Sequence, residues 1–362
     1  MTNRIFITHI LPHPFIEKYY LSTAACNFSF NLISGGVFDK VYSILGTYIE
    51  GRIDDEAFKD ERFSLHYHSR LRSLGRLGRF MAAIIEQCQI FAKISKGASV
   101  WLYNVTTVNA IIYLLLRLFK RSVQVNVIVL DFTPVEKGFG LNQLFLRIIN
   151  HCHGNIRLAE SPLFTNRNSI TLAGVVPAEA GKEPRIETIN NRFLLSGVLQ
   201  EQISQISMVL KAFANLPHCK LHITGKTNNE ELIQEYANKY PNIVWHGNLS
   251  FQEYLDVMHS CTFQLSTRDP KSPENQCNFP SKVIETLLHN RIIVSTIEYP
   301  QIAHVKYFKV DSAVEKFTTQ IDNISRMPAD TLMEYANQGR DVAEMFSTEV
   351  WNKAMTKIEE TI

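Results

Sequence analysis

The chain has 362 residues, of which 45% are apolar and 20% are charged, a balance that is normal for a soluble globular protein. This length exceeds one ordinary hydrophobic core, so two domains are expected. The formal net charge of +2 gives no global case for nucleic acid binding. Six scattered cysteines without a Cys-x-x-Cys pair indicate reduced thiols, and neither a disulfide framework nor a zinc site.

The N-terminal half alternates strand-like with helix-like stretches. A helical pattern covers 106–121, and β-branched apolar runs predict strands at 4–10, within 36–45, at 99–105 and at 123–132. This alternation predicts a parallel sheet with helices on both faces. The first 15 residues have no long apolar run, and Arg117 interrupts the apolar stretch 108–121. We therefore expect neither a signal peptide nor a membrane-spanning helix.

The segment 62–85 has five arginines, two histidines and no acidic residue. If it is helical, Arg72, Arg76 and Arg79 lie on one face, with leucines and Met81 interleaved. One interpretation is a basic amphipathic helix that rests on anionic lipid or binds a pyrophosphate-linked acceptor. The alternative is an ordinary solvated face above a core face.

A stretch with two prolines and two glycines, 174–191, predicts the linker between the domains. We place an N-terminal domain at 1–180, a second domain at 181–345, and a C-terminal helix at 346–362 that packs back on the first domain.

The second domain repeats the alternation of strands and helices. Ser250 is expected to cap one helix, and Pro280 to lie in the first turn of another. Strands are predicted at 192–197, 219–226, 242–247, 261–267 and 291–296. Helices are predicted at 203–216, 229–240, 250–260, 280–290, 311–325 and 327–361, the last with a break near 347–351. The whole chain is thus predicted to be α/β, with two doubly wound sheets.

Three of these strands are expected to end in glycine, at Gly197, Gly225 and Gly247. Ligands of doubly wound sheets sit beyond the carboxyl ends of the strands, where helix N-termini point. Glycine lets a ligand approach the backbone closely, although it also serves ordinary loop geometry. Three glycines on one sheet edge favour a binding site.

The segment "FPSKVIE" places Ser281 and Lys282 in the first turn of a helix. Free amides and the helix dipole attract anions there, and Lys282 adds a charge suited to phosphate. Glu285 lies one turn further on the same face, where a carboxylate can accept two hydrogen bonds from a ribose diol. The alternative is a surface ion pair worth a few tenths of a kcal/mol.

Three features together resemble the GT-B glycosyltransferases of the large retaining family 4. They are the Ser196-Gly197 turn, the run "KLHITGK…NIVWHGNLSFQEYLDVMHSC" and the segment "NFPSKVIETLLHNRIIVST". In the N-terminal half, "CNFSFNLISGGVFDKVYSI" and "VLDFTP" look like a subgroup that builds bacterial surface polysaccharides. The resemblance implies two Rossmann-like domains facing a central cleft.

The resemblance also implies roles for individual residues. Glu285 matches the glutamate that holds the donor ribose, and Lys282 would stabilise the diphosphate leaving group. A second glutamate of the family falls on Cys277, so Asn278 or Asn275 is expected to replace its donor-sugar contact. The full predicted donor set is Ser196, Gly197, Gly225, Gly247, Asn278, Phe279, Pro280, Ser281, Lys282 and Glu285.

Candidates on the acceptor side follow the first strands. His9 and Asp131 stand at strand ends, where they would assist proton transfer or contact a hydroxyl, and His13 would face the acceptor. Each has an ordinary structural alternative, such as an Asx turn at Asp131. Gly35 and Gly36 either face the acceptor or form a simple turn.

The expected function is transfer of a sugar from a UDP- or GDP-linked donor to a lipid-linked glycan acceptor in bacterial capsule or O-antigen biosynthesis, with retention of configuration. No cofactor or metal is expected beyond the nucleotide sugar, because no Asp-x-Asp pair is placed to hold one. The expected location is cytoplasmic, peripheral on the inner face of the plasma membrane. Two alternatives stay open: a non-catalytic glycosyltransferase-like subunit that docks a partner, and a sugar-nucleotide epimerase of the same fold.

Overall fold

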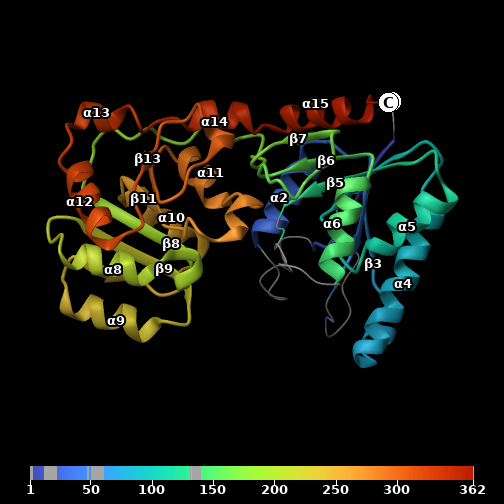
Figure 1. Ribbon diagram of the computed structural model, residues 1–362, viewed down its shortest axis with the longest axis horizontal. Helices are drawn as coiled ribbons and strands as arrows, with labels where there is room; N and C mark the ends of the chain where they lie inside the picture. Colours follow the sequence, from blue (N-terminus) through green and yellow to red (C-terminus); the bar gives the residue numbers. More distant parts are fainter. Residues whose placement is uncertain are drawn as a thin grey trace. The chain divides into compact units, whose positions relative to one another are not determined.

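The structure is a computed structural model that describes residues 3–11, 23–46, 49, 61–130, 132 and 140–361 (Figure 1). Its contacts divide the chain into two units. Unit 1 consists of Met1–Ala178, Gln276–Phe279 and Phe346–Ile362, and unit 2 consists of Glu179–Asn275 and Pro280–Met345. Within the described residues, no helix is both long enough and apolar enough to cross a bilayer.

Unit 1 is built on a seven-stranded parallel sheet in the order β3-β2-β1-β4-β5-β6-β7. Its strands are β1 Arg4–Thr8, β2 Lys40–Ile44, β3 Phe63–His66, β4 Ser99–Tyr103, β5 Gln124–Val129, β6 Gly154–Arg157 and β7 Ser169–Thr171. Its helices are α2 Thr23–Ser34, α3 Ser69–Arg72, α4 Gly75–Lys93, α5 Ala110–Phe119, α6 Leu141–His151 and α15 Thr348–Glu359. The predicted strands β1, β2, β4 and β5 and the predicted helix α5 are confirmed. All five residues of β4 are buried, as expected for a central strand covered on both faces.

The predicted single helix over 62–85 is wrong. Its first residues form β3, which pairs in parallel with β2 through the register Val41↔Phe63. The chain then makes the short helix α3, and α4 starts only at Gly75, whose φ of +78° interrupts helical geometry. Backbone pairing at the sheet edge thus replaces the expected first helical turns.

The predicted long helix over 327–361 is also wrong. Three short helices replace it, namely α13 Ala329–Met333, α14 Gly339–Met345 and α15. Asn337 has a left-handed φ of +60° between α13 and α14, and its side chain bonds the backbone of Ile186 in both directions, at 2.7 and 3.0 Å. The expected break near 347–351 is confirmed, because Ser347 caps α15 by accepting from the Val350 amide.

Helix α15 packs within unit 1. Trp351 is fully buried, and its Nε1 donates to the carbonyl of Gly174 at 2.7 Å. At the other end of the helix, the Glu359 carboxylate accepts hydrogen bonds from Arg4, Ser99 and Trp101 at 2.6 to 2.9 Å. These contacts attach the last residues of the chain to the first strand.

Unit 2 is a six-stranded parallel sheet in the order β10-β9-β8-β11-β12-β13. Its strands are β8 Arg192–Leu199, β9 Lys220–Thr227, β10 Ile243–Trp245, β11 Phe263–Ser266, β12 Ile292–Ser295 and β13 Phe308–Lys309. Beside α13 and α14, its helices are α7 Glu201–Ser204, α8 Ile206–Ala214, α9 Glu230–Lys239, α10 Phe251–Ser260, α11 Ser281–Leu288 and α12 Val314–Ser325.

The predicted strands of unit 2 are all present. Ser250 caps α10 as expected, in a full capping box with Glu253. Pro280 is the N-cap of α11, one position before the predicted first turn. The predicted α/β class with two doubly wound parallel sheets is therefore confirmed.

Candidate functional site

The three predicted glycines of unit 2 lie together. Gly197 and Gly225 are paired across β8 and β9, and the Gly225 amide donates to the Gly247 carbonyl at 3.0 Å. All three have positive φ, of +112°, +139° and +70°. An added Cβ on Gly225 would stand 1.9 Å from the Gly197 carbonyl oxygen, so only glycine fits there. The expectation that the strands end at Gly197 and Gly225 is wrong by two residues, since β8 and β9 continue to Leu199 and Thr227.

The N-terminus of α11 has backbone donors that its cap residue does not use. Pro280 has no side-chain group to accept from the first-turn amides, and the structure records no such cap bond. Ser281, the first helical residue, is exposed. Amides in this position, at the positive end of the helix dipole, suit an anionic ligand.

Lys282 is held against an aromatic ring. Its Nζ is 3.2 Å from Glu285 Oε2 and 3.7 Å from the centroid of the Tyr254 ring. A Cβ on Gly197 would stand 4.0 Å from Lys282 Cε, so the amine stem borders the glycine cluster. The side chains of Lys282 and Glu285 are 35% and 29% exposed, which is less than a free surface ion pair would be.

The electrostatics keep Lys282 charged. Burial acts to lower the pKa of Lys282, but Glu285 and Tyr254 outweigh it, and the net pKa is raised. Burial and Glu285 raise the pKa of Tyr254, while Lys282 and a hydrogen bond with Ser196 act in the opposite direction. At neutral pH the cluster therefore holds a charged amine beside a neutral phenol, a suitable pair for diphosphate and hydroxyl groups.

Sequence analysis missed two polar residues of this cluster, Tyr254 and Gln264. Tyr254 is 7% exposed on the inner face of α10, a position that sequence pattern alone assigns to core packing. Gln264 lies on β11 with its Nε2 donating to Ser196 Oγ at 3.2 Å, and its Oε1 is buried without a partner. An unsatisfied buried amide oxygen is uncommon and is often found where a ligand supplies the missing donor.

The stretch before α11 belongs to unit 1 by its contacts. Cys277 is fully buried in the core of unit 1, where its Sγ donates to Ser161 Oγ at 3.5 Å and burial raises the pKa of its thiol. The Asn278 Oδ1 accepts from the Phe132 amide at 2.8 Å, and Phe279 is 5% exposed. Asn275, the other candidate for the sugar contact, bonds Asp269 and Arg268.

Two of the acceptor-side candidates, His13 and Asp131, lie outside the described residues. His9 follows β1, with its ring edge-on to Tyr103 at 4.7 Å between centroids. Burial lowers the pKa of His9 to about 4, and its buried Nδ1 has no hydrogen-bond partner. An imidazole with so low a pKa is a weak base, so near neutral pH its free nitrogen suits a hydrogen bond better than proton transfer.

The structure explains Gly35 and Gly36 without a ligand. Gly36 takes a left-handed φ of +68° directly after α2, and its amide and that of Val37 bond back to Ile33 and Leu32. This is a glycine C-cap. A Cβ on Gly35 would clash with the Thr348 side chain at 2.5 Å, so close packing against α15 requires glycine.

The placement of Arg72 on an exposed basic face is wrong. Arg72 is 1% exposed, its Nη2 is 2.5 Å from Glu86 Oε2, and its guanidinium lies over the Tyr67 ring. Glu86 lies one residue beyond the acid-free segment 62–85, which is why the segment seemed to lack a partner for its arginines. Arg76 is exposed and Arg79 half-buried at the start of α4.

Comparisons with known proteins identify the fold of the chain. No family model matches the chain, and no curated protein matches its sequence. Among solved structures, the chain resembles Anabaena HepE in complex with UDP and glucose, with a TM-score of 0.66, 12% identity and 98% coverage of each chain. Sucrose-phosphate synthase from Thermosynechococcus elongatus gives 0.64 with 14% identity, covering 99% of this chain and 98% of that one. The UDP-forming trehalose-phosphate synthase from Burkholderia xenovorans with glucose-6-phosphate gives 0.69 with 8% identity, covering 99% and 100%.

These neighbours define the class of fold. Both parallel sheets of the chain match those of GT-B glycosyltransferase structures over nearly the full length. The chain therefore has the GT-B fold, as the sequence resemblance implied.

Proposed function

We propose that the chain is a glycosyltransferase that takes a hexose from a nucleoside diphosphate sugar. The observation that carries this proposal is the cluster of Lys282, Glu285 and Tyr254 beside the uncapped N-terminus of α11 and the glycines of β8 and β9. An anion-attracting helix N-terminus, a cation and a diol acceptor within one helical turn fit the chemistry of a nucleoside diphosphate.

In the proposed reaction, the diphosphate binds the Ser281 and Lys282 amides and the Lys282 ammonium, which leaves its ion pair with Glu285. The glycine cluster lets the diphosphate approach the backbone, and Glu285 accepts hydrogen bonds from the ribose. Negative charge grows on the leaving diphosphate as the glycosidic bond breaks, so preorganised donors at this position lower the barrier. The family resemblance favours retention of configuration.

The structural neighbours support UDP as the nucleotide. HepE is recorded with UDP and glucose, and the trehalose-phosphate synthase is UDP-forming. TarM from S. aureus, recorded with UDP, matches with a TM-score of 0.55 over 78% of this chain and 59% of that one, at 12% identity. A UDP-sugar is accordingly the donor to test first, with a GDP-sugar second.

The acceptor is proposed to be a lipid-linked glycan of bacterial capsule or O-antigen biosynthesis. Support comes from the start of α4, where four large apolar side chains are exposed beside the exposed Arg76. They are Leu74 at 70%, Leu77 at 74%, Phe80 at 58% and Met81 at 45%. Exposed apolar side chains next to arginine suit the boundary between headgroups and acyl chains of an anionic membrane. We propose peripheral membrane contact through this surface.

The donor proposal is tested by measuring the thermal shift of the purified protein with UDP, GDP, CDP and ADP and their common sugar conjugates. Stabilisation by UDP and its sugar conjugates is expected, because a ligand that binds only the folded state raises its stability. Glu285→Ala should abolish the shift, while Glu334→Ala, which alters an exposed ion pair with Lys306 in the same unit, should not.

Absence of a shift with every nucleotide would overturn the donor proposal. It would favour the non-catalytic subunit, a reading that Cys277 supports because a buried thiol stands where the family has a sugar-binding glutamate. Conversion of a UDP-sugar without any acceptor would instead indicate an epimerase.

The membrane proposal has its own test, sedimentation with vesicles that contain anionic phosphatidylglycerol. A Leu77→Glu and Phe80→Glu double variant should lose most of its vesicle binding. Phe251→Glu, which changes an equally exposed ring on unit 2, should keep it. Equal sedimentation of all three proteins would contradict the proposed surface.

A further inference from the structure

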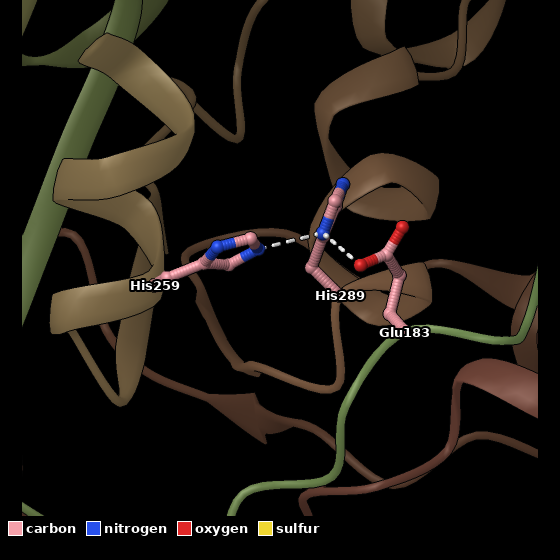
Figure 2. Close-up of side chains that lie close together, drawn as sticks. All are labelled: Glu183, His259 and His289. Carbon is pink, nitrogen blue, oxygen red and sulfur yellow. Dashed lines mark hydrogen bonds and ion pairs between the residues drawn. The ribbon is translucent and has the colours of Figure 1, made fainter. Parts of the chain in front are cut away.

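Three side chains of unit 2 outside the donor cluster point toward one another (Figure 2). His259 lies in the last turn of α10, His289 is the C-cap of α11, and Glu183 lies in the segment that leads into β8. His259 Nε2 is 2.9 Å from His289 Nδ1, which is 3.6 Å from Glu183 Oε2. All three ligand atoms lie within 4.8 Å of one another.

The backbone holds these residues in place. Asn290 follows His289 with a left-handed φ of +63°, and its Nδ2 donates to the carbonyls of Glu183 at 2.9 Å and Pro184 at 3.1 Å. Its Oδ1 accepts from the Gly339 amide at 3.0 Å. The Glu183 segment is thereby fixed beside the end of α11, so the cluster does not depend on chance contact between long side chains.

Charged groups from several elements surround the two imidazoles. Burial is the largest cause that lowers the pKa of His259 and of His289, and Arg291 lowers both further, while Glu183 acts to raise them. Asp256 and Glu285 are the other charged groups that act on the pair. The two helix C-termini beside the imidazoles contribute partial negative charge, which favours a cation.

We propose that Glu183, His259 and His289 bind one divalent transition-metal cation, with Zn²⁺ as the best chemical match. Zinc takes histidine nitrogen and carboxylate oxygen at about 2.0–2.2 Å, so tetrahedral ligand atoms stand about 3.3 Å apart. The observed separations of 2.9 and 3.6 Å lie on either side of that value, and the third, between His259 and Glu183, is within 4.8 Å. The exposed Glu183 and His259 side chains must therefore move inward for all three atoms to reach one metal ion. Mg²⁺ and Ca²⁺ prefer all-oxygen sites and are not expected.

A metal ion at this position would cross-link three segments of unit 2. The metal would join the segment before β8 to the ends of α10 and α11, with water completing the coordination because His259 and Glu183 are exposed. Lys282 lies at the opposite end of α11 from His289, whereas Glu285 lies one turn before His289 and acts to raise its pKa. The proposed metal site thus shares no side chain with the proposed donor site.

The experiment is calorimetric titration of untagged, chelator-treated protein with ZnCl₂, together with the visible absorption spectrum of the Co²⁺-loaded protein. We expect one Zn²⁺ per chain, a tetrahedral Co²⁺ spectrum, and a rise in melting temperature that a chelator reverses. His259→Ala and His289→Ala should each weaken binding at least about tenfold, and Glu183→Gln should weaken it too. His304→Ala, an exposed histidine of the same unit, should bind as the wild type does.

Two results would overturn the site. Wild-type Zn²⁺ affinity in the His259→Ala/His289→Ala double variant would place the metal elsewhere, and absence of stoichiometric binding would make the pair an ordinary hydrogen bond between imidazoles. The thermal shift with UDP serves as the folding control. If the proposed donor site is correct, all these variants keep that shift, and failure of the metal site leaves it unchanged.

Discussion

The structure changes the interpretation of Lys282 from a surface ion pair to a partly buried cation. An exposed lysine three residues from a glutamate contributes ~0–1 kcal/mol to stability and indicates nothing about function. Here the ammonium lies over the Tyr254 ring and beside Glu285, with its stem against Gly197. A partly desolvated cation whose charge is maintained by its neighbours is suited to exchange its carboxylate for a phosphate.

Lys282→Met should therefore weaken UDP binding about 10- to 100-fold, because a hydrogen bond to a charged group contributes ~1.5–3 kcal/mol. Methionine keeps the apolar stem on Tyr254, so the melting temperature without ligand should change little. Calorimetric titration with UDP measures the loss. Lys316→Met, which removes an exposed partner of Asp311, is the control, and equal affinities of the two variants would contradict a phosphate role for Lys282.

At the scale of elements, the glycines of β8 and β9 test whether the site geometry is built into the sheet. Gly225→Ala should destabilise unit 2 severely, since its Cβ would stand 1.9 Å from a backbone oxygen at a φ of +139°. A Cβ added at Gly247 meets no atom within 4 Å, so Gly247→Ala should lower the free energy of unfolding only by the ~1–2 kcal/mol that a left-handed alanine costs. Urea unfolding of both variants gives the comparison. Similar urea midpoints for the two variants would mean that β8 and β9 can move apart to accommodate the alanine at position 225.

Helix α15 offers a matched pair of glutamates. Glu359 is 7% exposed and bonds Arg4, Ser99 and Trp101, while Glu349 makes an exposed pair with Lys353. Glu359→Ala should lower the free energy of unfolding by about 3 kcal/mol, because it leaves a nearly buried arginine unpaired. Glu349→Ala should change it by less than about 1 kcal/mol. Denaturant unfolding checks both, and equal losses would show that α15 is not anchored through Glu359.

Local sequence patterns correctly predicted the helices and strands whose ends or composition are set by nearby residues. Ser250 with Glu253 announces the start of α10, and the β-branched runs of β4 and β12 have the composition of buried parallel strands. The prediction failed where a distant partner decides the conformation. Residues 63–66 are a strand because β2 offers backbone partners, and Arg72 is buried because Glu86 neutralises it.

The same distinction applies to the candidate site. The sequence alone predicted Gly197, Lys282 and Glu285, because a glycine at a strand end and charged residues at a helix start are visible in a short stretch of sequence. Tyr254 and Gln264 could not, since a residue on the inner side of a helix or strand has the same local pattern whether it faces the core or a ligand. Only the parallel pairing of β8 with β11 brings Gln264 to Ser196.

At the scale of the whole molecule, each unit is built from segments that are not continuous in sequence. Besides its N-terminal part, unit 1 includes Gln276–Phe279 and the residues from Phe346 onward. Helix α11 starts just after Gln276–Phe279, with Pro280 as its N-cap. Helix α11 thus begins where the chain leaves one unit for the other.

Both units share one acid-sensitive feature, a buried neutral histidine. Burial is the main cause that lowers the pKa of His9 in unit 1 and of His222 in unit 2 from the usual 6.5 to about 4, and His246, Lys220 and Arg192 also lower that of His222. Between pH 6.5 and 4 the unfolded chain binds protons at these sites that the folded chain does not. The free energy of unfolding contributed by these groups is therefore complete above pH 6.5 and is lost as the pH falls toward 4.

Each histidine should add a slope of up to about 1.4 kcal/mol per pH unit within that window. Urea unfolding at several pH values from 6.5 down to 4, in the presence of a chelator, measures the slope. His222→Gln keeps a polar group beside His246 but cannot bind a proton, so it should reduce the slope even if its stability near neutral pH is lower. His304→Gln, at an exposed position, should leave the slope as it is. An unchanged slope in His222→Gln would mean that this imidazole already titrates in the folded unit, and that burial does not keep it neutral.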